Sequence, residues 1–239
     1  MKQFISLVFF SCLALFSLSV PPAVRAEANL EDVIATVEQS YNSLTDLQAA
    51  FSQKTYLASV KRERKGVGTL SIKKVADRPA MFRFDYTKPK QLIVSNGVSV
   101  WFYLSENRQV MITNLKGLFE GSQGITLNYL TGMGRISRDF TISFLNGGRD
   151  DQGNYLLELI PKKPNHVLTK LQMTVSEKAV ETYLSKGKIR NTFPLLSSVF
   201  FDQFGTKTTI EFSNVRVNRK LPASLFRFTV PAGVEVVRQ

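Results

Sequence analysis

The hydrophobic pattern of the chain begins with a helical period and then changes to a period of two. Residues 29–44 carry apolar side chains at helical spacing, with Asn29 placed to cap the helix and the acids Glu31 and Asp32 in its first turn. The apolar stripe consists of Leu30, Val33, Ile34, Val37, Tyr41 and Leu44. This pattern predicts one amphipathic helix whose apolar side lies on an apolar surface.

From Leu47 onward, alternation of apolar and polar positions predicts β-strands. After the strand that begins at Leu47, the expected strands are residues 66–73, 81–86, 91–94, 98–103, 109–112, 140–145, 155–160, 168–175, 180–185, 195–202, 206–212 and 227–230. Asn96-Gly97 is a two-residue hairpin signal, and residues 146–148, 151–153 and 186–187 are expected breaks. This succession of strands, joined mostly by short turns, predicts one large antiparallel sheet that curls to bury a face.

Two segments depart from the alternation. Residues 115–133 are apolar without a strict period, so we expect a short helix or loop there. Residues 61–65 are basic apart from Glu63, which predicts a solvated hairpin tip; docking to a membrane surface or a partner is the alternative.

The N-terminus has the features of a cleavable export signal. A short basic start is followed by an apolar run over residues 4–20, by Pro21-Pro22, and by Val24-Arg25-Ala26 with small residues at positions −3 and −1. The run falls short of the roughly 20 strongly apolar residues that a membrane span needs. We expect cleavage after Ala26, which would leave one domain over residues 27–239 outside the cytoplasm.

Candidate chemistry is sparse. Cys12, the single cysteine, lies inside the predicted signal, so disulfides and thiol chemistry are not expected in the mature chain. With one histidine, His166, a metal site is not expected either. We find no glycine-rich phosphate loop, nucleophile elbow or HExxH motif, and the acid pairs lie in capping or turn contexts. The expectation is a protein without catalytic residues, metal or cofactor.

The positive net charge of the chain favours anionic partners. The chain has a formal net charge of +12 at pH 7. For an exported protein, anionic partners are lipid head groups and envelope proteins, and nucleic acid is not expected.

Residues 78–110 carry a more specific pattern, which resembles the signature of the outer-membrane lipoprotein carrier family, LolA. The matching residues are Arg78-Pro79, Phe82, Phe84, Pro89, Leu92-Ile93-Val94, Asn96-Gly97, Trp101, Tyr103 and Gln109-Val110. Flanking matches are Phe51-Ser52-Gln53-Lys54, Gly68-Thr69-Leu70 and the ending Phe226, Phe228, Val230-Pro231 and Gly233-Val234. The chain departs from the family at Phe84, where tryptophan is usual, and residues 115–153 show no matching motif.

The resemblance implies a mainly β fold with helices: an incomplete, unclosed antiparallel β-barrel covered by an α-helical lid. It further implies a soluble periplasmic chaperone that binds the acyl chains of lipoproteins released from the inner membrane and delivers them to the outer membrane. The implied partners are acylated lipoproteins, an inner-membrane ABC transporter of the LolCDE type and an outer-membrane acceptor of the LolB type. A monomer is expected.

The resemblance also implies roles for individual residues. Arg78 would hold the lid shut over the empty cavity through bonds to backbone carbonyls, and Phe82 would be an aromatic at the mouth. By strand alternation Phe84 and Tyr86 share the face of Phe82. The residues expected at the latch and cavity are Arg78, Phe51, Phe82, Phe84, Tyr86, Trp101 and Tyr103.

Two other functions on the same fold stay open. One is a periplasmic carrier of another amphiphile, such as a glycolipid, which the positive charge favours. The other is a lipoprotein-sensing regulatory domain; such proteins usually carry a further C-terminal domain, whereas this chain ends shortly after Val237. A LolB-type acceptor would need a lipobox cysteine, which Cys12 does not provide.

Overall fold

A computed structural model describes residues 27–76, 78–116, 135–163, 168–189 and 191–238. The predicted signal over residues 1–26, with Cys12, lies outside the described residues. So do His166 and residues 117–133 of the predicted lid.

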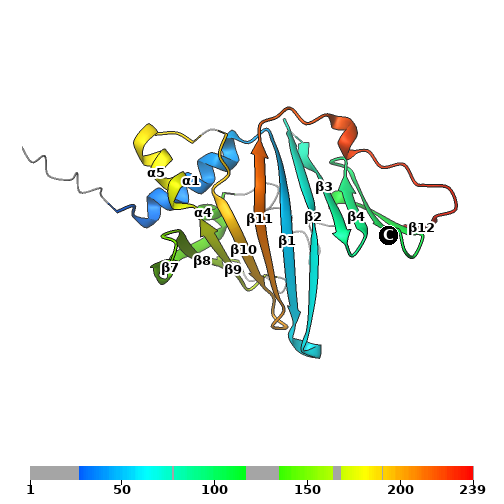
Figure 1. Cartoon of the computed structure of the whole chain (residues 1–239), viewed down its shortest axis with the longest axis horizontal. Helices are drawn as coiled ribbons and strands as arrows, with labels where there is room; N and C mark the ends of the chain where they lie inside the picture. The colour runs from blue at the N-terminus through cyan, green and yellow to red at the C-terminus, as the bar shows by residue number, and fades with distance from the viewer. Residues whose placement is uncertain (1–26, 77, 117–134, 164–167, 190, 239) are drawn as a thin grey trace, which may run out of the picture.

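The described strands form one twelve-stranded sheet that does not close (Figure 1). The strands are β1 (Asp46–Leu57), β2 (Arg62–Val75), β3 (Arg78–Lys88), β4 (Gln91–Ser95), β5 (Ser99–Leu104), β6 (Gln109–Asn114), β7 (Phe140–Arg149), β8 (Tyr155–Pro161), β9 (Lys170–Val175), β10 (Leu195–Phe201), β11 (Lys207–Val217) and β12 (Glu235–Arg238). Their order is β12-β6-β5-β4-β3-β2-β1-β11-β10-β9-β8-β7, and every neighbouring pair is antiparallel except β12 with β6. The predicted mainly β, unclosed sheet is confirmed.

Three α-helices are described: α1 (Leu30–Ser43), α4 (Ile136–Asp139) and α5 (Glu177–Lys186). Short 3-10 turns occur at η1 (Ala58–Val60) and η2 (Ala223–Phe226). None of these helices has the length and apolar character that a membrane span requires.

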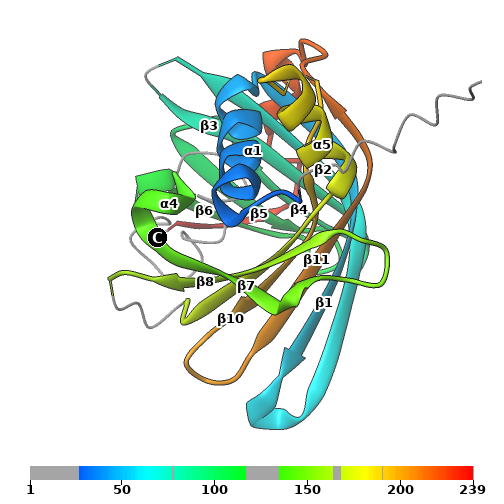
Figure 2. The same ribbon diagram turned by 90° about the vertical axis from the view of Figure 1, so that its left-hand side faces the viewer.

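The predicted first helix is confirmed together with its cap. The side-chain oxygen of Asn29 accepts the backbone N–H of Asp32 at 2.9 Å, and the Asp32 carboxylate accepts the N–H of Asn29 at 3.2 Å. This reciprocal capping box satisfies amides that the first turn leaves without helical partners. The sheet curves around α1, which lies against its concave face (Figure 2). Val33 and Val37 of α1 belong to the same buried cluster as the inner side chains of the strands.

Two of the predicted strands are wrong. Residues 180–185 lie in α5, which Ser176 caps through the N–H of Ala179 and which ends at Gly187 in the left-handed region. Residues 227–230 form no strand, and the last strand is β12. The expected break at residues 146–148 lies within β7, where all three residues have positive φ and the pairing with β8 shifts register.

The chain after β11 forms a segment that crosses the outer side of the sheet to reach β6 (Figure 1). We call residues 218–238 the C-terminal strap. Lys73 on β2 donates to the carbonyl of Leu221 at 2.6 Å, and Arg83 on β3 donates to that of Leu225 at 3.4 Å. Phe226 of the strap is fully buried. The strap therefore gives the outer face of β3 to β6 an apolar cover of its own.

Candidate functional site

Strand register arranges the inner side chains of β1 to β6 in three rows across the concave face. Paired residues in adjacent strands point to the same side, so the rows can be followed from strand to strand. The first row is Leu47, Ile72, Phe82 and Val100; the second is Ala49, Leu70, Phe84, Ile93, Phe102 and Met111; the third is Phe51, Tyr86 and Leu104. We refer to these as the apolar rows.

Exposure rises from the first row to the third. On β5, Val100 is fully buried, Phe102 is half-buried and Leu104 is 38% exposed. On β3, Phe82 is fully buried and Tyr86 is half-buried. The first row belongs to the core beneath α1, and the other rows extend past it toward the end of the sheet where the β1–β2 hairpin turns. The structure thus leaves apolar side chains accessible on the inner face of β3 to β6.

Four of the predicted site residues meet in an aromatic cluster. Phe51 contacts Phe84 and Tyr86 edge-to-face, with ring centroids 5.7 and 4.9 Å apart. Phe82 contacts Phe84 at 6.1 Å, also edge-to-face. Aromatic rings favour this geometry because the positive edge of one ring faces the negative face of the other.

A glycine on β2 makes this cluster possible. Gly68 pairs with both Phe51 on β1 and Tyr86 on β3, and its missing side chain lets the two rings meet across β2. A Cβ at Gly68 would collide with the backbone of Asp85 and lie 2.9 Å from the Cα of Tyr86. Close approach of the strands therefore requires glycine here.

Tyr86 gives the third row one polar group. Its hydroxyl donates to the side-chain oxygen of Gln53 at 2.7 Å. Burial raises the pKa of Tyr86 to about 12, so the phenol stays neutral at ordinary pH. A second buried phenol, Tyr41 of α1, has no hydrogen-bond partner for its hydroxyl in the described part of the chain, and burial raises its pKa well above the ordinary value.

Trp101 and Tyr103 lie on the other side of the sheet, which corrects the expectation that they line the same cavity. They alternate with Val100 and Phe102 on β5 and pack against Phe228 of the C-terminal strap, with ring centroids 6.3 and 5.5 Å apart. Alternation shows that the two residues share a face, but the strap determines which face that is.

Arg78 begins β3 and is exposed. No hydrogen bond or ion pair joins its side chain to another residue that the structure describes. Its expected partners belong to the predicted lid, of which residues 117–133 lie outside the described residues. The latch stays a prediction.

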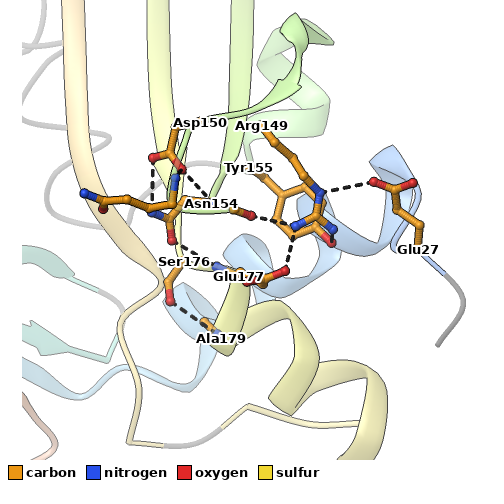
Figure 3. A network of polar contacts seen from close by, with 10 residues as sticks. Glu27, Arg149, Asp150, Asn154, Tyr155, Ser176, Glu177 and Ala179 are labelled. Atoms are coloured by element: carbon orange, nitrogen blue, oxygen red, sulfur yellow. Dashed lines mark hydrogen bonds and ion pairs between the residues drawn. The ribbon is translucent and has the colours of Figure 1, made fainter. Parts of the chain in front are cut away.

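A polar network on the opposite half of the sheet was missed by sequence reasoning (Figure 3). Arg149 of β7 donates to Glu177 of α5 at 2.7 Å and to Glu27 at 3.1 Å, and its guanidinium lies 4.2 Å from the ring centroid of Tyr155. The network ties the β7–β8 hairpin to α5 and to the residues that precede α1. Its members are far apart in the sequence, and no local pattern connects them.

The described residues also bear on the expectations for metal ligands and acid pairs. No group of three or more His, Cys, Asp or Glu residues in the described part of the chain could hold a metal ion. The acid pairs have the structural settings expected of them: Asp32 completes the cap of α1, and Asp150 accepts the backbone N–H groups of Gln152 and Asn154 in a turn.

The fold is an open, mostly antiparallel sheet curved around one helix, and its inner face carries partly exposed apolar side chains on β4 to β6. The family model described as outer membrane lipoprotein carrier protein LolA matches residues 42–229. The chain belongs to this family.

Two relatives compared by sequence agree with the family match. The chain is 30% identical over 234 residues to an outer-membrane lipoprotein carrier protein of Nitrosomonas europaea, covering 97% of this chain and 98% of the relative. It is 33% identical over 196 residues to one of Methylococcus capsulatus, covering 82% of each. Among solved structures, it is similar to a LolA superfamily protein from Nitrosomonas europaea with a TM-score of 0.39 and 12% identity, covering 84% of this chain and 99% of that one.

The role of Gly68 can be tested by adding one methyl group. Gly68→Ala should lower the free energy of unfolding by about 1–3 kcal/mol, because the new Cβ forces β2 and β3 apart. Thr69→Ala is the matched control, since Thr69 is exposed on the other face and its loss should change stability by less than about 0.5 kcal/mol. Urea unfolding followed by circular dichroism measures both. Equal stability of the two variants would show that close strand approach at Gly68 is not needed.

Proposed function

We propose that this protein is a soluble periplasmic carrier that holds the acyl chains of lipoproteins on its apolar rows and delivers them to the outer membrane. The observation that carries the proposal is the rise in exposure along the apolar rows, from fully buried Val100 to Leu104, on an inner face made of aliphatic and aromatic side chains. Family membership supports it, because LolA proteins are lipoprotein carriers.

The energy of acyl transfer explains why such a face is needed. Taking acyl chains out of a bilayer costs about 0.8 kcal/mol per CH₂, so three chains of roughly 16 carbons would cost tens of kcal/mol in water. Contact with the second and third rows offsets part of that cost by removing the chains from water again.

The remaining parts of the proposal rest on the family. Residues 1–26 would be removed on export, leaving one mature domain that acts as a monomer and catalyses no reaction. A LolCDE-type transporter would load the carrier, and a LolB-type acceptor would receive the cargo. Arg78 would hold the lid shut through bonds to backbone carbonyls, which a guanidinium makes well, and cargo would shift the population toward the open state.

A carrier of another amphiphile is the second candidate, favoured by the positive charge: the +12 of the full sequence becomes about +10 when Lys2 and Arg25 are removed with residues 1–26. Mass spectrometry of material that copurifies with the protein separates the two candidates, because a triacylated protein and a phosphate-bearing glycolipid differ in mass. A lipoprotein-sensing role would instead show regulatory effects without transfer of cargo to the outer membrane.

A charge on the third apolar row should weaken cargo binding. Leu104→Glu places a carboxylate on the proposed acyl-binding face, and we expect the retained lipoprotein to fall at least about tenfold, because an ionised group there opposes burial of an acyl chain. Leu184→Glu on α5 is the matched control, since Leu184 is 45% exposed against 38% for Leu104. The amount of acylated lipoprotein copurifying with each variant is the measurement. Equal retention by both variants would contradict binding at this row.

Arg78 provides a test of the latch. Arg78→Leu should leave the fold intact, because the side chain is exposed, and should slow transfer of bound lipoprotein to an acceptor membrane. Arg227→Leu, at another exposed arginine, should transfer cargo at the rate of the unchanged protein. If the Arg78 variant also transfers normally, the latch does not exist.

A further inference from the structure

Two hairpins project side by side from one end of the sheet. The β1–β2 turn and the β10–β11 turn lie together in both views of the ribbon (Figures 1 and 2). A Cβ added to Gly205 would lie 3.1 Å from the Cβ of Ala58, so the two turns are in contact. We call residues 54–65 and 201–207 the hairpin tip surface.

Each turn exposes a large apolar side chain. Val60 is 57% exposed and Phe204 is 69% exposed. The Phe204 turn is well ordered by hydrogen bonds, because the Asp202 carboxylate accepts the backbone N–H groups of Phe204 and Thr206, each at 2.8 Å. The aromatic ring is thus held outward on a defined turn, away from the buried core.

The same surface is strongly cationic. Its six basic residues are Lys54, Lys61, Arg62, Arg64, Lys65 and Lys207, and with the two acids Glu63 and Asp202 they leave four net positive charges. Glu63 already pairs with Lys54 at 2.8 Å and Lys65 at 3.4 Å, while Asp202 is engaged in its turn. Three of the cations, Lys61, Arg62 and Arg64, are exposed and form no ion pair with any residue that the structure describes.

We propose that the hairpin tip surface docks on an anionic lipid bilayer, with its cations on head-group phosphates and with Val60 and Phe204 in the interface. Charge complementarity selects the anionic head groups, because each Lys or Arg near such a surface is attracted to it. The apolar groups are single side chains at the ends of turns, not a flat patch. A bilayer interface accepts such isolated groups between cations whose stems can reach the phosphates.

Docking in this way would place the apolar rows near the membrane. From Phe51 in the third row, β1 continues six residues to Leu57 at the tip, a length of roughly 20 Å at 3.3 Å per residue. The less buried end of the rows faces this hairpin, so a chain leaving the bilayer beside the tip would meet the third row first. The docking itself requires no cargo, and it stands or fails separately from the proposed function.

Vesicle binding tests the cationic part of the proposal. The purified protein should float with vesicles of phosphatidylcholine mixed with phosphatidylglycerol, should not float with phosphatidylcholine alone, and should be released by salt. Loss of one cation from such a surface lowers the affinity for the vesicles by about fivefold. The triple variant Lys61→Gln/Arg62→Gln/Arg64→Gln should therefore bind the mixed vesicles about a hundredfold more weakly than the unchanged protein. The control Lys178→Gln/Lys186→Gln/Lys188→Gln removes the same charge from exposed residues in and after α5, and should bind within about threefold of the unchanged protein.

A second pair of variants tests insertion. Phe204→Ser should weaken binding to the mixed vesicles about tenfold, because an exposed aromatic ring is lost from the interface. Leu184→Ser, at the exposed leucine of α5, should leave binding unchanged. Circular dichroism confirms that each variant is folded.

The proposal is overturned if the protein binds neither type of vesicle or binds both types equally. It is also overturned if the variants of the hairpin tip surface bind the mixed vesicles as well as the matched control variants in and after α5. Absence of vesicle binding together with tip-dependent capture of a purified envelope protein would assign the surface to a protein partner instead.

Discussion

The inner face of the sheet carries more apolar surface than α1 can cover, and this mismatch governs the rest of the structure. A helix of 14 residues is roughly 20 Å long, whereas the rows cross six strands at about 4.8 Å spacing and continue along each strand. Burying Val33 and Val37 in the same cluster as the first row stabilises the fold and holds α1 in place. The second and third rows keep partly exposed side chains on β4 to β6, among them Ile93, Phe102 and Leu104. A protein that must take up acyl chains needs such a surface, kept within a curved sheet and away from bulk water.

The outer face shows how the same sheet hides apolar side chains permanently. On β5, Trp101 and Tyr103 are covered by Phe228 of the C-terminal strap, and the strap is joined to the sheet by hydrogen bonds from Lys73 and Arg83. Pairing of β12 with β6 fixes its far end. The two faces of β5 therefore differ in their cover: the strap packs on the outer face, while Phe102 and Leu104 on the inner face stay partly exposed.

Much of this could be predicted from the sequence because the signals were local. Alternation identified most strands, and the cap residue and apolar stripe identified α1. Ser176 and Gly187 carried cap signals for α5 that outweigh the short alternation around Val180. The face of Trp101 and the network of Glu27, Arg149 and Glu177 depend on segments far apart in the sequence, so no local pattern could reveal them. The contact between the rings of Phe51 and Tyr86 likewise depends on the pairing of β1, β2 and β3 at Gly68, which a local pattern does not reveal.

The central claim is that acyl chains bind the inner face of the sheet and not the outer face. Phe102 and Trp101 are neighbours on β5 that point to opposite faces, so a photo-crosslinking amino acid at each position tests the claim within one strand. The measurement is the amount of acylated lipoprotein crosslinked to each variant after export. Our account predicts crosslinking at position 102 and little at position 101. Equal crosslinking at both positions, or crosslinking at 101 alone, would contradict it.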